Sequence, residues 1–256
     1  MLRAVDRAEA AGLTSRHPAQ PGRFAFVHAL FRSARYEALP CSRRLLLHQR
    51  VAHTLAGRAA DDRVILDLAR HAFAALPLGN AHLAIDACRR AGDFVSRCLG
   101  FDEAARYYRN ALDVASGIES RDDALCCELA IRLGEALTFA GDAEGRAVLE
   151  QAATSARRLR ASELLATASW ALSQFGLGFL GLFDPFVASA AEEALAGLGP
   201  EPTATRARLL LVLAAEYAGS LDHHQRRQAL WAEALAVARQ LDDPVTLAHV
   251  LAAYQW

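Results

Sequence analysis

The pattern of apolar and polar positions predicts a chain built almost entirely of helices. From residue 29 onward, apolar residues recur three and four positions apart, which is the spacing of one face of a helix. Individual helices are expected to end at Pro40, Pro77 and Gly100, because proline and glycine stop a helix. The exception is residues 24–27, Phe-Ala-Phe-Val, where bulky and small residues alternate and predict a short strand.

The residues around this strand predict a joint between two kinds of structure. A first helix over residues 1–11 ends at Gly12, and residues 14–22 form a loop that leads into the strand. After the helix that ends at Pro40, Ser42 is expected to cap the next one, because its hydroxyl can accept backbone N–H bonds. We therefore expect the chain to begin partway through a small domain.

Two sets of markers repeat in the second half of the chain. Four pairs end in an aspartate, 40, 42 and 38 residues apart: Phe101-Asp102, Gly141-Asp142, Phe183-Asp184 and Leu221-Asp222. Four pairs of small and apolar residues recur 41, 42 and 40 residues apart: Ala111-Leu112, Ala152-Ala153, Ala194-Leu195 and Ala234-Leu235. A period near 40 residues that contains two helices predicts a solenoid, in which each hairpin buries its apolar face by stacking on its neighbours.

Residues 101–112 resemble the second helix of a tetratricopeptide repeat, with Ala104, Tyr108 and Ala111 where small and large side chains interlock. The other units match this pattern more loosely. Asp102 and Asp184 are predicted to cap helices with their carboxylates.

The joint near the N-terminus resembles the winged-helix segment of the STAND-type signalling ATPases, in particular the large LuxR-type bacterial regulators and their adenylate-cyclase and kinase relatives. In that family the run F-x-H-x-L-x-R-x-x-x-Y-x-x-L precedes R-R-x-x-L-H-x-R-V-A-x-x-L. The matching residues are Phe26, His28, Leu30, Arg32, Tyr36, Leu39, Arg43, Arg44, Leu47, His48, Arg50, Val51, Ala52 and Leu55.

With this resemblance, the predicted fold class is all-α, a tetratricopeptide-like superhelix of helical hairpins preceded by a small partial winged-helix region with a short β wing. The predicted domains are the partial winged helix at 1–56, connecting helices at 57–100, and the repeats at 101–256.

The resemblance also gives His28 a candidate role. It implies that His28 stands where related NB-ARC proteins place the histidine of their Met-His-Asp motif, which touches the β-phosphate of bound ADP; Ala29 replaces the aspartate. The alternative is a structural role, in which His28 caps the helix that follows.

Composition excludes several kinds of site from this chain. All 28 cationic residues are arginine, so no lysine can complete a phosphate-binding loop or form a pyridoxal Schiff base. We therefore expect no cofactor here, and ATP or ADP only in an ATPase module of the parent protein. The formal charge of −1 gives no overall basic field, which predicts no direct nucleic-acid contact.

The apolar runs are shorter than the roughly 20 residues that a membrane helix needs, and the charged N-terminus does not resemble a signal peptide. The five cysteines form no C-x-x-C pair, which predicts reduced, mostly buried thiols in a cytoplasmic protein.

Other motifs favour structural interpretations. Residues 176–181 fit G-x-G-x-x-G, but they follow a helix rather than a strand, so an apolar linker within a repeat is expected. His223-His224 lacks further metal ligands and predicts a solvated helix start. Arg43-Arg44 and His48 are expected to face solvent, with an interdomain contact as the alternative. No catalytic or metal site is predicted.

These observations predict a non-catalytic segment of a LuxR-like signalling regulator that senses an effector and controls transcription. A protein, peptide or small effector is expected on the concave repeat surface. The final helix, from Val245 to Trp256, has apolar residues without a partner, so the array continues in the parent protein or the chain self-associates there. The alternatives are a free-standing tetratricopeptide-like scaffold, a sensor arm of an adenylate cyclase and a helical enzyme.

Overall fold

The structure is a computed structural model of the 256-residue chain. It describes residues 2–16, 24–58, 62–174, 182–218 and 223–253. Within these ranges it contains thirteen helices and two short strands. In chain order they are α1 (Leu2–Ala10), β1 (Thr14–Arg16), β2 (Phe24–Phe26), α2 (Ala29–Glu37), α3 (Cys41–Ala56), α4 (Asp62–Ala74), α5 (Ala81–Arg97), α6 (Phe101–Gly117), α7 (Asp123–Phe139), α8 (Glu144–Leu159), α9 (Ser162–Ser173), α10 (Pro185–Leu198), α11 (Ala204–Glu216), α12 (His224–Gln240) and α13 (Pro244–Ala253).

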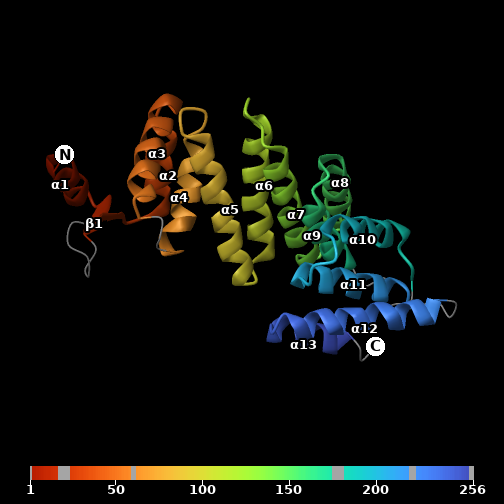
Figure 1. The fold of residues 1–256 in the computed structure, drawn as a ribbon. Coiled ribbons are helices and arrows are strands. Elements are labelled where there is room, and N and C mark those ends of the chain that lie inside the picture. The colour runs from red at the N-terminus through yellow and green to blue at the C-terminus, as the bar shows by residue number, and fades with distance from the viewer. Residues whose placement is uncertain (1, 17–23, 59–61, 175–181, 219–222, 254–256) are drawn as a thin grey trace.

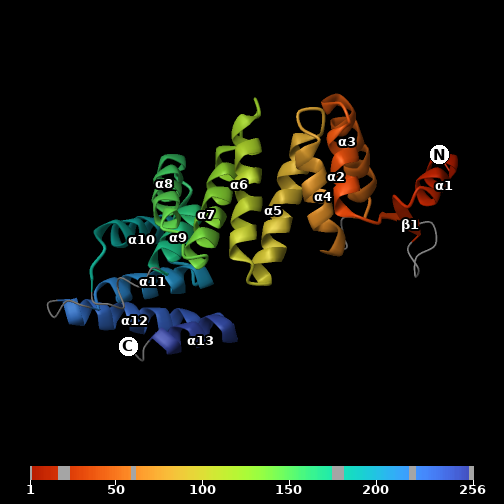
Figure 2. The same ribbon diagram turned by 180° about the vertical axis from the view of Figure 1, so that it is seen from behind.

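The helices form one continuous row, an all-α helical-repeat fold. Each helix from α3 to α13 packs against the next along the chain. The helices from α3 to α8 stand side by side, and those from α10 to α13 lie nearly across them, so the row twists along its length (Figures 1 and 2). Helices α7, α9, α11 and α13 also contact one another, which places them in the inner layer and the even-numbered helices in the outer layer.

A small antiparallel sheet precedes the row. Strand β1 pairs with β2, with Thr14 opposite Phe26 and Arg16 opposite Phe24. The strand predicted at residues 24–27 is therefore observed, one residue shorter. Gly12 follows α1 with a φ of +66°, a left-handed conformation that glycine adopts without strain.

The repeat markers occupy buried positions of the outer helices. The first members of the four small pairs lie on α6, α8, α10 and α12 and are at most 2% exposed: Ala111, Ala152, Ala194 and Ala234. Small side chains there let each outer helix approach its neighbours closely. The period of about 40 residues thus reflects the packing of successive hairpins.

Glycines on the inner helices let large side chains of the outer helices approach. A Cβ atom at Gly92 of α5 would lie 2.5 Å from the ring of Tyr108 on α6. A Cβ atom at Gly134 of α7 would lie 2.6 Å from Cγ of Leu149 on α8. In two successive hairpins, therefore, a glycine on one helix makes room for a large buried side chain of the other helix.

Of the helix caps predicted at Asp184, Asp102 and Ser42, the first is right and the other two are wrong. Asp184 caps α10, where its Oδ1 accepts bonds from the N–H groups of Phe186 and Val187 at 3.0 and 3.3 Å. Asp102 does not cap α6, because that helix already begins at Phe101 after Gly100. Ser42 does not cap α3 either, because that helix begins at Cys41, directly after Pro40.

The apolar core is shared across the predicted domain boundaries. One cluster of buried side chains extends from α3 to α7, a second from α7 to α11, and a third from α11 to α13. The boundary predicted at residue 100 lies inside the first cluster, where α5 packs on α6. Among the described residues, no helix combines the length and apolar character needed to cross a bilayer.

Candidate functional site

A groove lies between three consecutive helices of the row. Helices α6 and α8 form its walls, α7 forms its floor, and its volume is about 660 Å³. It opens on the side of the even-numbered helices. The lining residues are Leu112, Ser116, Arg121, Asp123, Cys126, Cys127, Ala130, Leu133, Val148, Gln151, Ala152, Ser155, Arg158 and Leu159.

The floor of the groove is set by the start of α7. Asp122 caps this helix by accepting bonds from the N–H groups of Ala124 and Leu125, both at 3.0 Å. The cap fixes where the first turn begins and so turns Cys126 and Cys127 toward the hydrophobic core. The Cys127 thiol donates to the carbonyl of Ala152 on α8 at 3.3 Å, which ties the floor to one wall.

The electrostatics of the groove favour binding over covalent chemistry. Burial raises the pKa of the Cys127 thiol, which therefore stays protonated and weakly nucleophilic. Two arginines lie at the mouth: Arg121 pairs with Asp123 at 2.6 Å, and Arg158 donates to the Ser155 hydroxyl at 3.1 Å. The groove thus combines apolar walls with a mouth that carries two guanidinium groups and one carboxylate.

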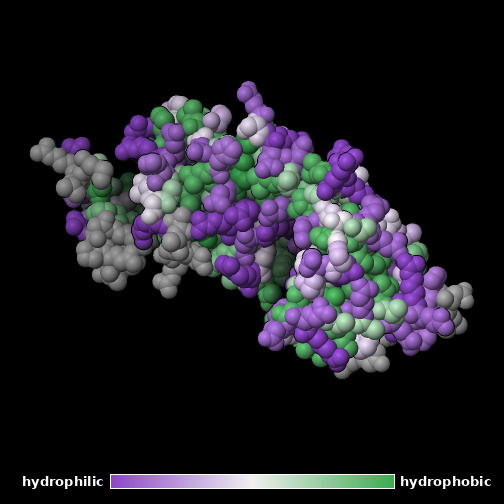
Figure 3. Space-filling view, in the orientation of Figure 1, coloured by the Kyte–Doolittle hydropathy of each residue, from purple (hydrophilic) through white to green (hydrophobic). Residues whose placement is uncertain are grey.

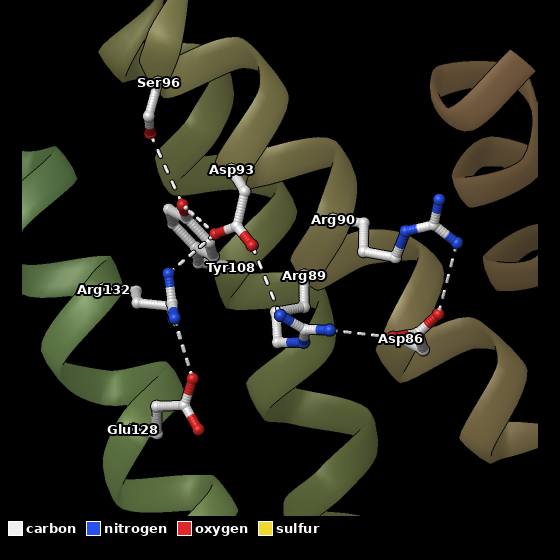
Figure 4. Close-up of polar contacts among 8 residues, drawn as sticks. All are labelled: Asp86, Arg89, Arg90, Asp93, Ser96, Tyr108, Glu128 and Arg132. Carbon is white, nitrogen blue, oxygen red and sulfur yellow. Dashed lines mark hydrogen bonds and ion pairs between the residues drawn. The ribbon is translucent and has the colours of Figure 1, made fainter. Parts of the chain in front are cut away.

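The opposite face of α7 carries a polar network that joins three helices (Figure 4). Asp93 of α5 is its centre. The Asp93 carboxylate accepts hydrogen bonds from the Tyr108 hydroxyl of α6 and from Nη1 of Arg132 on α7, both at 2.8 Å. Arg132 also pairs with Glu128 at 2.9 Å, and Arg89 reaches Asp93 at 3.3 Å.

This network holds the floor helix in register with α5 and α6. Burial, aided by the nearby Asp93 carboxylate, raises the pKa of Tyr108 to about 12, so its hydroxyl remains a donor. Burial alone would lower the pKa of Arg132, but the charges of Asp93 and Glu128 raise it. Tyr108 and Arg132 therefore keep their protons across the ordinary pH range, and their bonds to Asp93 join α6 and α7 to α5.

His28, the residue singled out by the family resemblance, caps α2. Its Nδ1 accepts a hydrogen bond from the N–H of Leu30 at 3.2 Å, and its ring lies edge-on to Phe31. The side chain is exposed. The structure therefore shows the capping alternative, and the nucleotide contact in the parent protein stays a prediction.

His48 connects three helices rather than facing solvent alone. Its Nε2 lies 2.8 Å from the Tyr36 hydroxyl of α2, and its Nδ1 lies 2.9 Å from Nδ1 of His71 on α4. The guanidinium of Arg44 lies over the Tyr36 ring at 5.3 Å, and Arg43 is exposed. One side of this helix thus makes contacts with neighbouring helices and the other faces solvent, while an interdomain contact stays a prediction.

The His48–His71 pair predicts that stability falls in mild acid. Burial, followed by the charge of Arg70, lowers the pKa of both imidazoles from 6.5. Below that value the unfolded chain takes up protons that the folded pair rejects, so the free energy of unfolding decreases as pH falls toward the lowered pKa values. Above 6.5 the pair contributes no pH dependence.

Thermal unfolding followed by circular dichroism from about pH 8 to pH 5 measures this effect. The midpoint should fall more steeply below pH 6.5 for the wild type than for His71→Gln, which keeps a donor to His48 without the titration. Equal slopes for the two proteins would contradict the assignment.

His223 and His224 are not among the residues that line the groove. His223 precedes α12 and its ring lies 4.9 Å from that of Tyr217, while His224 begins the helix. No group of three potential metal ligands occurs in the described parts of the chain. Residues 176–181, with the G-x-G-x-x-G pattern, and the Leu221-Asp222 marker lie outside the described residues.

Sequence reasoning did not find the groove, although one signal pointed to the network beside it. Ion pairs link residues about one repeat apart: Asp93 and Arg132 are 39 positions apart, and Arg146 and Asp184 are 38 apart. In a solenoid, residues one period apart lie side by side on adjacent hairpins. Opposite charges at this spacing could therefore have been paired from the sequence.

The chain matches no family model and no curated protein. Among solved structures, the crystal structure of BtubC (BKLC) from P. vanneervenii is similar, with a TM-score of 0.50 and 20% sequence identity. The similarity covers 85% of this chain and 85% of that chain. At this identity it shows the fold alone, a helical-repeat row.

Proposed function

We propose that this chain is an interaction and effector-sensing unit that binds its partner in the groove between α6, α7 and α8. One observation carries the proposal: a single hollow of about 660 Å³ combines apolar walls with two arginines at its mouth. Ligand pockets are typically about 300–1,000 Å³ with apolar walls and a few polar groups that orient the ligand. The occupant is therefore a short peptide or small effector with an apolar body and a carboxylate.

The row of hairpins suits a binding role without catalysis. The groove walls come from two successive hairpins, so an occupant contacts both and fixes their relative position. The network around Asp93 holds the floor helix against α5 and α6, and the Cys127 thiol joins the floor helix to α8. Binding in this groove therefore depends on the local curvature of the row.

The predicted concave surface remains a second candidate binding surface. Three side chains from successive inner helices meet there: Trp170 of α9, Arg208 of α11 and His249 of α13. The Arg208 guanidinium lies 5.8 Å from the Trp170 ring centroid, and the Trp170 and His249 rings lie 6.4 Å apart. This cluster offers stacking and a positive charge to a partner.

We further propose that the repeats are tetratricopeptide-like and that residues 1–56 are part of a winged helix from a STAND-type, LuxR-like regulator. The residues from Phe26 to Leu55 that match the family pattern support this parentage. In such a parent protein, effector binding by the repeats would shift an ATPase module, contributed by other residues, between closed and open states and so control transcription. His28 would touch ADP only in that context, in the cytoplasm.

A random 12-residue peptide library displayed on phage tests the groove. Peptides selected on the wild-type chain should be rich in apolar residues and carry aspartate or glutamate, which pair with Arg121 and Arg158. The Ser155→Trp variant, which fills the groove with an indole, should bind them about tenfold more weakly, a loss of about 1.4 kcal/mol.

Thr154→Trp is the matched control, because Thr154 is the exposed neighbour of Ser155 and does not line the groove. It should bind the selected peptides as the wild type does. Failure to enrich any peptide, or equal binding to the Ser155→Trp variant, would overturn the assignment of the groove.

A further inference from the structure

Charge is strongly segregated along this nearly neutral chain. Residues 24–58 contain six arginines and a single acidic residue, Glu37, whereas residues 61–256 contain 18 arginines and 26 acidic residues. The net charge of −1 hides this asymmetry. The α2–α3 region is therefore a basic end on an otherwise acidic row.

The arginines of the basic end differ from those of the later helices. Among the residues that the structure describes, none of the six forms an ion pair with a carboxylate. They are Arg32, Arg35, Arg43, Arg44, Arg50 and Arg58. Most arginines of the later helices, by contrast, pair within or between hairpins, as Arg109 does with Glu144 at 2.8 Å.

One face of α3 combines these arginines with exposed apolar side chains. Arg43, Leu46, Leu47, Arg50 and Val51 follow one another at helical spacing on this face, which we call the α3 face. Its three apolar members are 43%, 37% and 37% exposed. Hydrophobic surface is visible over α3 at this end of the row (Figure 3).

The α3 face has the character of a helix-packing surface, and its apolar members stay exposed among the described residues. The other side of α3 packs on α4, where Ala52 is buried. Exposed apolar stripes rimmed by charge mark protein interfaces. Nucleic acid would neutralise the arginines but leave the leucines uncovered, so the apolar content favours a protein surface.

A complementary surface lies on the same chain, at the turns between α5 and α6 and between α7 and α8. We call it the acidic edge: Leu99, Asp102, Glu103, Phe139 and Asp142. Leu99 is 75% exposed and Phe139 is 55% exposed. The rings of Phe101 and Phe139 stack 5.0 Å apart, which brings the two turns together.

We propose that the α3 face of one molecule binds the acidic edge of a second copy of this chain. Apolar side chains meet at the centre of the contact, and arginines of one copy face carboxylates of the other at its rim. Two α3 faces cannot pair with each other, because their arginines would repel. The contact is therefore head to tail, which forms chains or closed rings of copies.

Sedimentation equilibrium of the full chain tests this proposal. The average mass of the wild type should rise over about 1 to 100 µM at low salt, and the association should weaken at about 0.5 M salt as the charges are screened. A mass that stays at one chain throughout this range would overturn the proposal.

Charge reversal identifies the two surfaces. Arg43→Glu with Arg50→Glu, and separately Asp102→Arg with Glu103→Arg, should each weaken self-association at least about tenfold, because each leaves like charges facing one another. An equimolar mixture of the two double variants should associate again, since each then presents a surface complementary to the other.

The double variant Arg160→Glu with Arg239→Glu is the control for the arginine reversal, because it makes the same change in net charge as that variant at exposed sites elsewhere. It should associate as the wild type does, and so should the groove variant Ser155→Trp. Association that survives either reversal would place the contact on another surface, such as the exposed Val245 and Leu251 of α13, and would overturn the proposal.

Discussion

Replacing Asp184 by alanine should destabilise the chain more than any other single change considered, by about 3 kcal/mol. Asp184 is 7% exposed and has three roles. Its carboxylate caps α10 and accepts a bond from Nη2 of Arg146 on α8 at 2.6 Å, while its own N–H donates to Glu216 of α11 at 2.7 Å. Alanine removes the cap and leaves the Arg146 charge without this carboxylate.

The surrounding charges act on this loss in opposite directions, because alanine takes a carboxylate from Arg146 but also relieves the repulsion between Asp184 and Glu216. Burial raises the pKa of Glu216, and the Asp184 carboxylate raises it further, so this acidic pair depends on Arg146 for compensation. Burial alone would lower the pKa of Arg146, yet Asp184 and Glu150 together raise it. Three helices of the row, α8, α10 and α11, therefore meet at Asp184.

Urea unfolding followed by circular dichroism measures the loss. Asp184→Asn should lose less than alanine, because asparagine keeps the cap but not the charge. Asp102→Ala is the matched control: Asp102 was also predicted to cap a helix, but it lies exposed within α6, so its loss should cost less than about 0.5 kcal/mol. Equal losses at the two positions would show that the contacts of Asp184 do not stabilise the row.

Replacing Gly92 by alanine should lower the free energy of unfolding by about 1 to 3 kcal/mol. The added Cβ would lie 2.5 Å from Cε1 of Tyr108 and 2.8 Å from two other ring atoms. The Tyr108 ring cannot retreat easily, because it is 3% exposed and its hydroxyl is bonded to Asp93. Helices α5 and α6 must therefore separate to admit one methyl group.

Gly117→Ala separates this clash from the general preference of helices for alanine. No atom lies within 4 Å of a Cβ at Gly117, so this change should be neutral or should stabilise by up to about 1 kcal/mol in urea unfolding. Adding Tyr108→Leu to Gly92→Ala should cost less than the sum of the two single changes, because the smaller side chain admits the methyl group. Additive losses would contradict the proposed contact.

The helical-repeat fold could be predicted because its constraints recur at a fixed spacing. A small residue is needed at each point where an outer helix packs on its neighbours, as at Ala111 and Ala234, so the repeat period is visible in the sequence. The cap at Asp184 followed from the Asp-Pro pair, since the carboxylate and the proline ring both favour a helix start. His28 could be placed at a helix start, and it is there.

The groove could not be predicted in the same way. Its walls belong to helices that are not consecutive, and the gap between them depends on side chains of α7 such as Cys126 and Leu133. The cap was misplaced for a local reason: Leu99 adopts a φ of 61°, and the helix cap lies at Gly100, two residues earlier than the Asp102 pattern suggests. Residue propensities do not predict a leucine with a positive φ, because leucine rarely adopts the left-handed conformation.

The stacking of each helix on its neighbours has a mechanical consequence. Among the described helices, contacts run mainly between neighbours in the row, so the two ends of the row are linked through the interfaces between them. Slight rotations at the successive interfaces add up to a large displacement between α3 and α13. An occupant that moves α6 away from α8 therefore also displaces the two ends of the row relative to each other, while every helix stays folded. A small binding energy can in this way cause a large displacement.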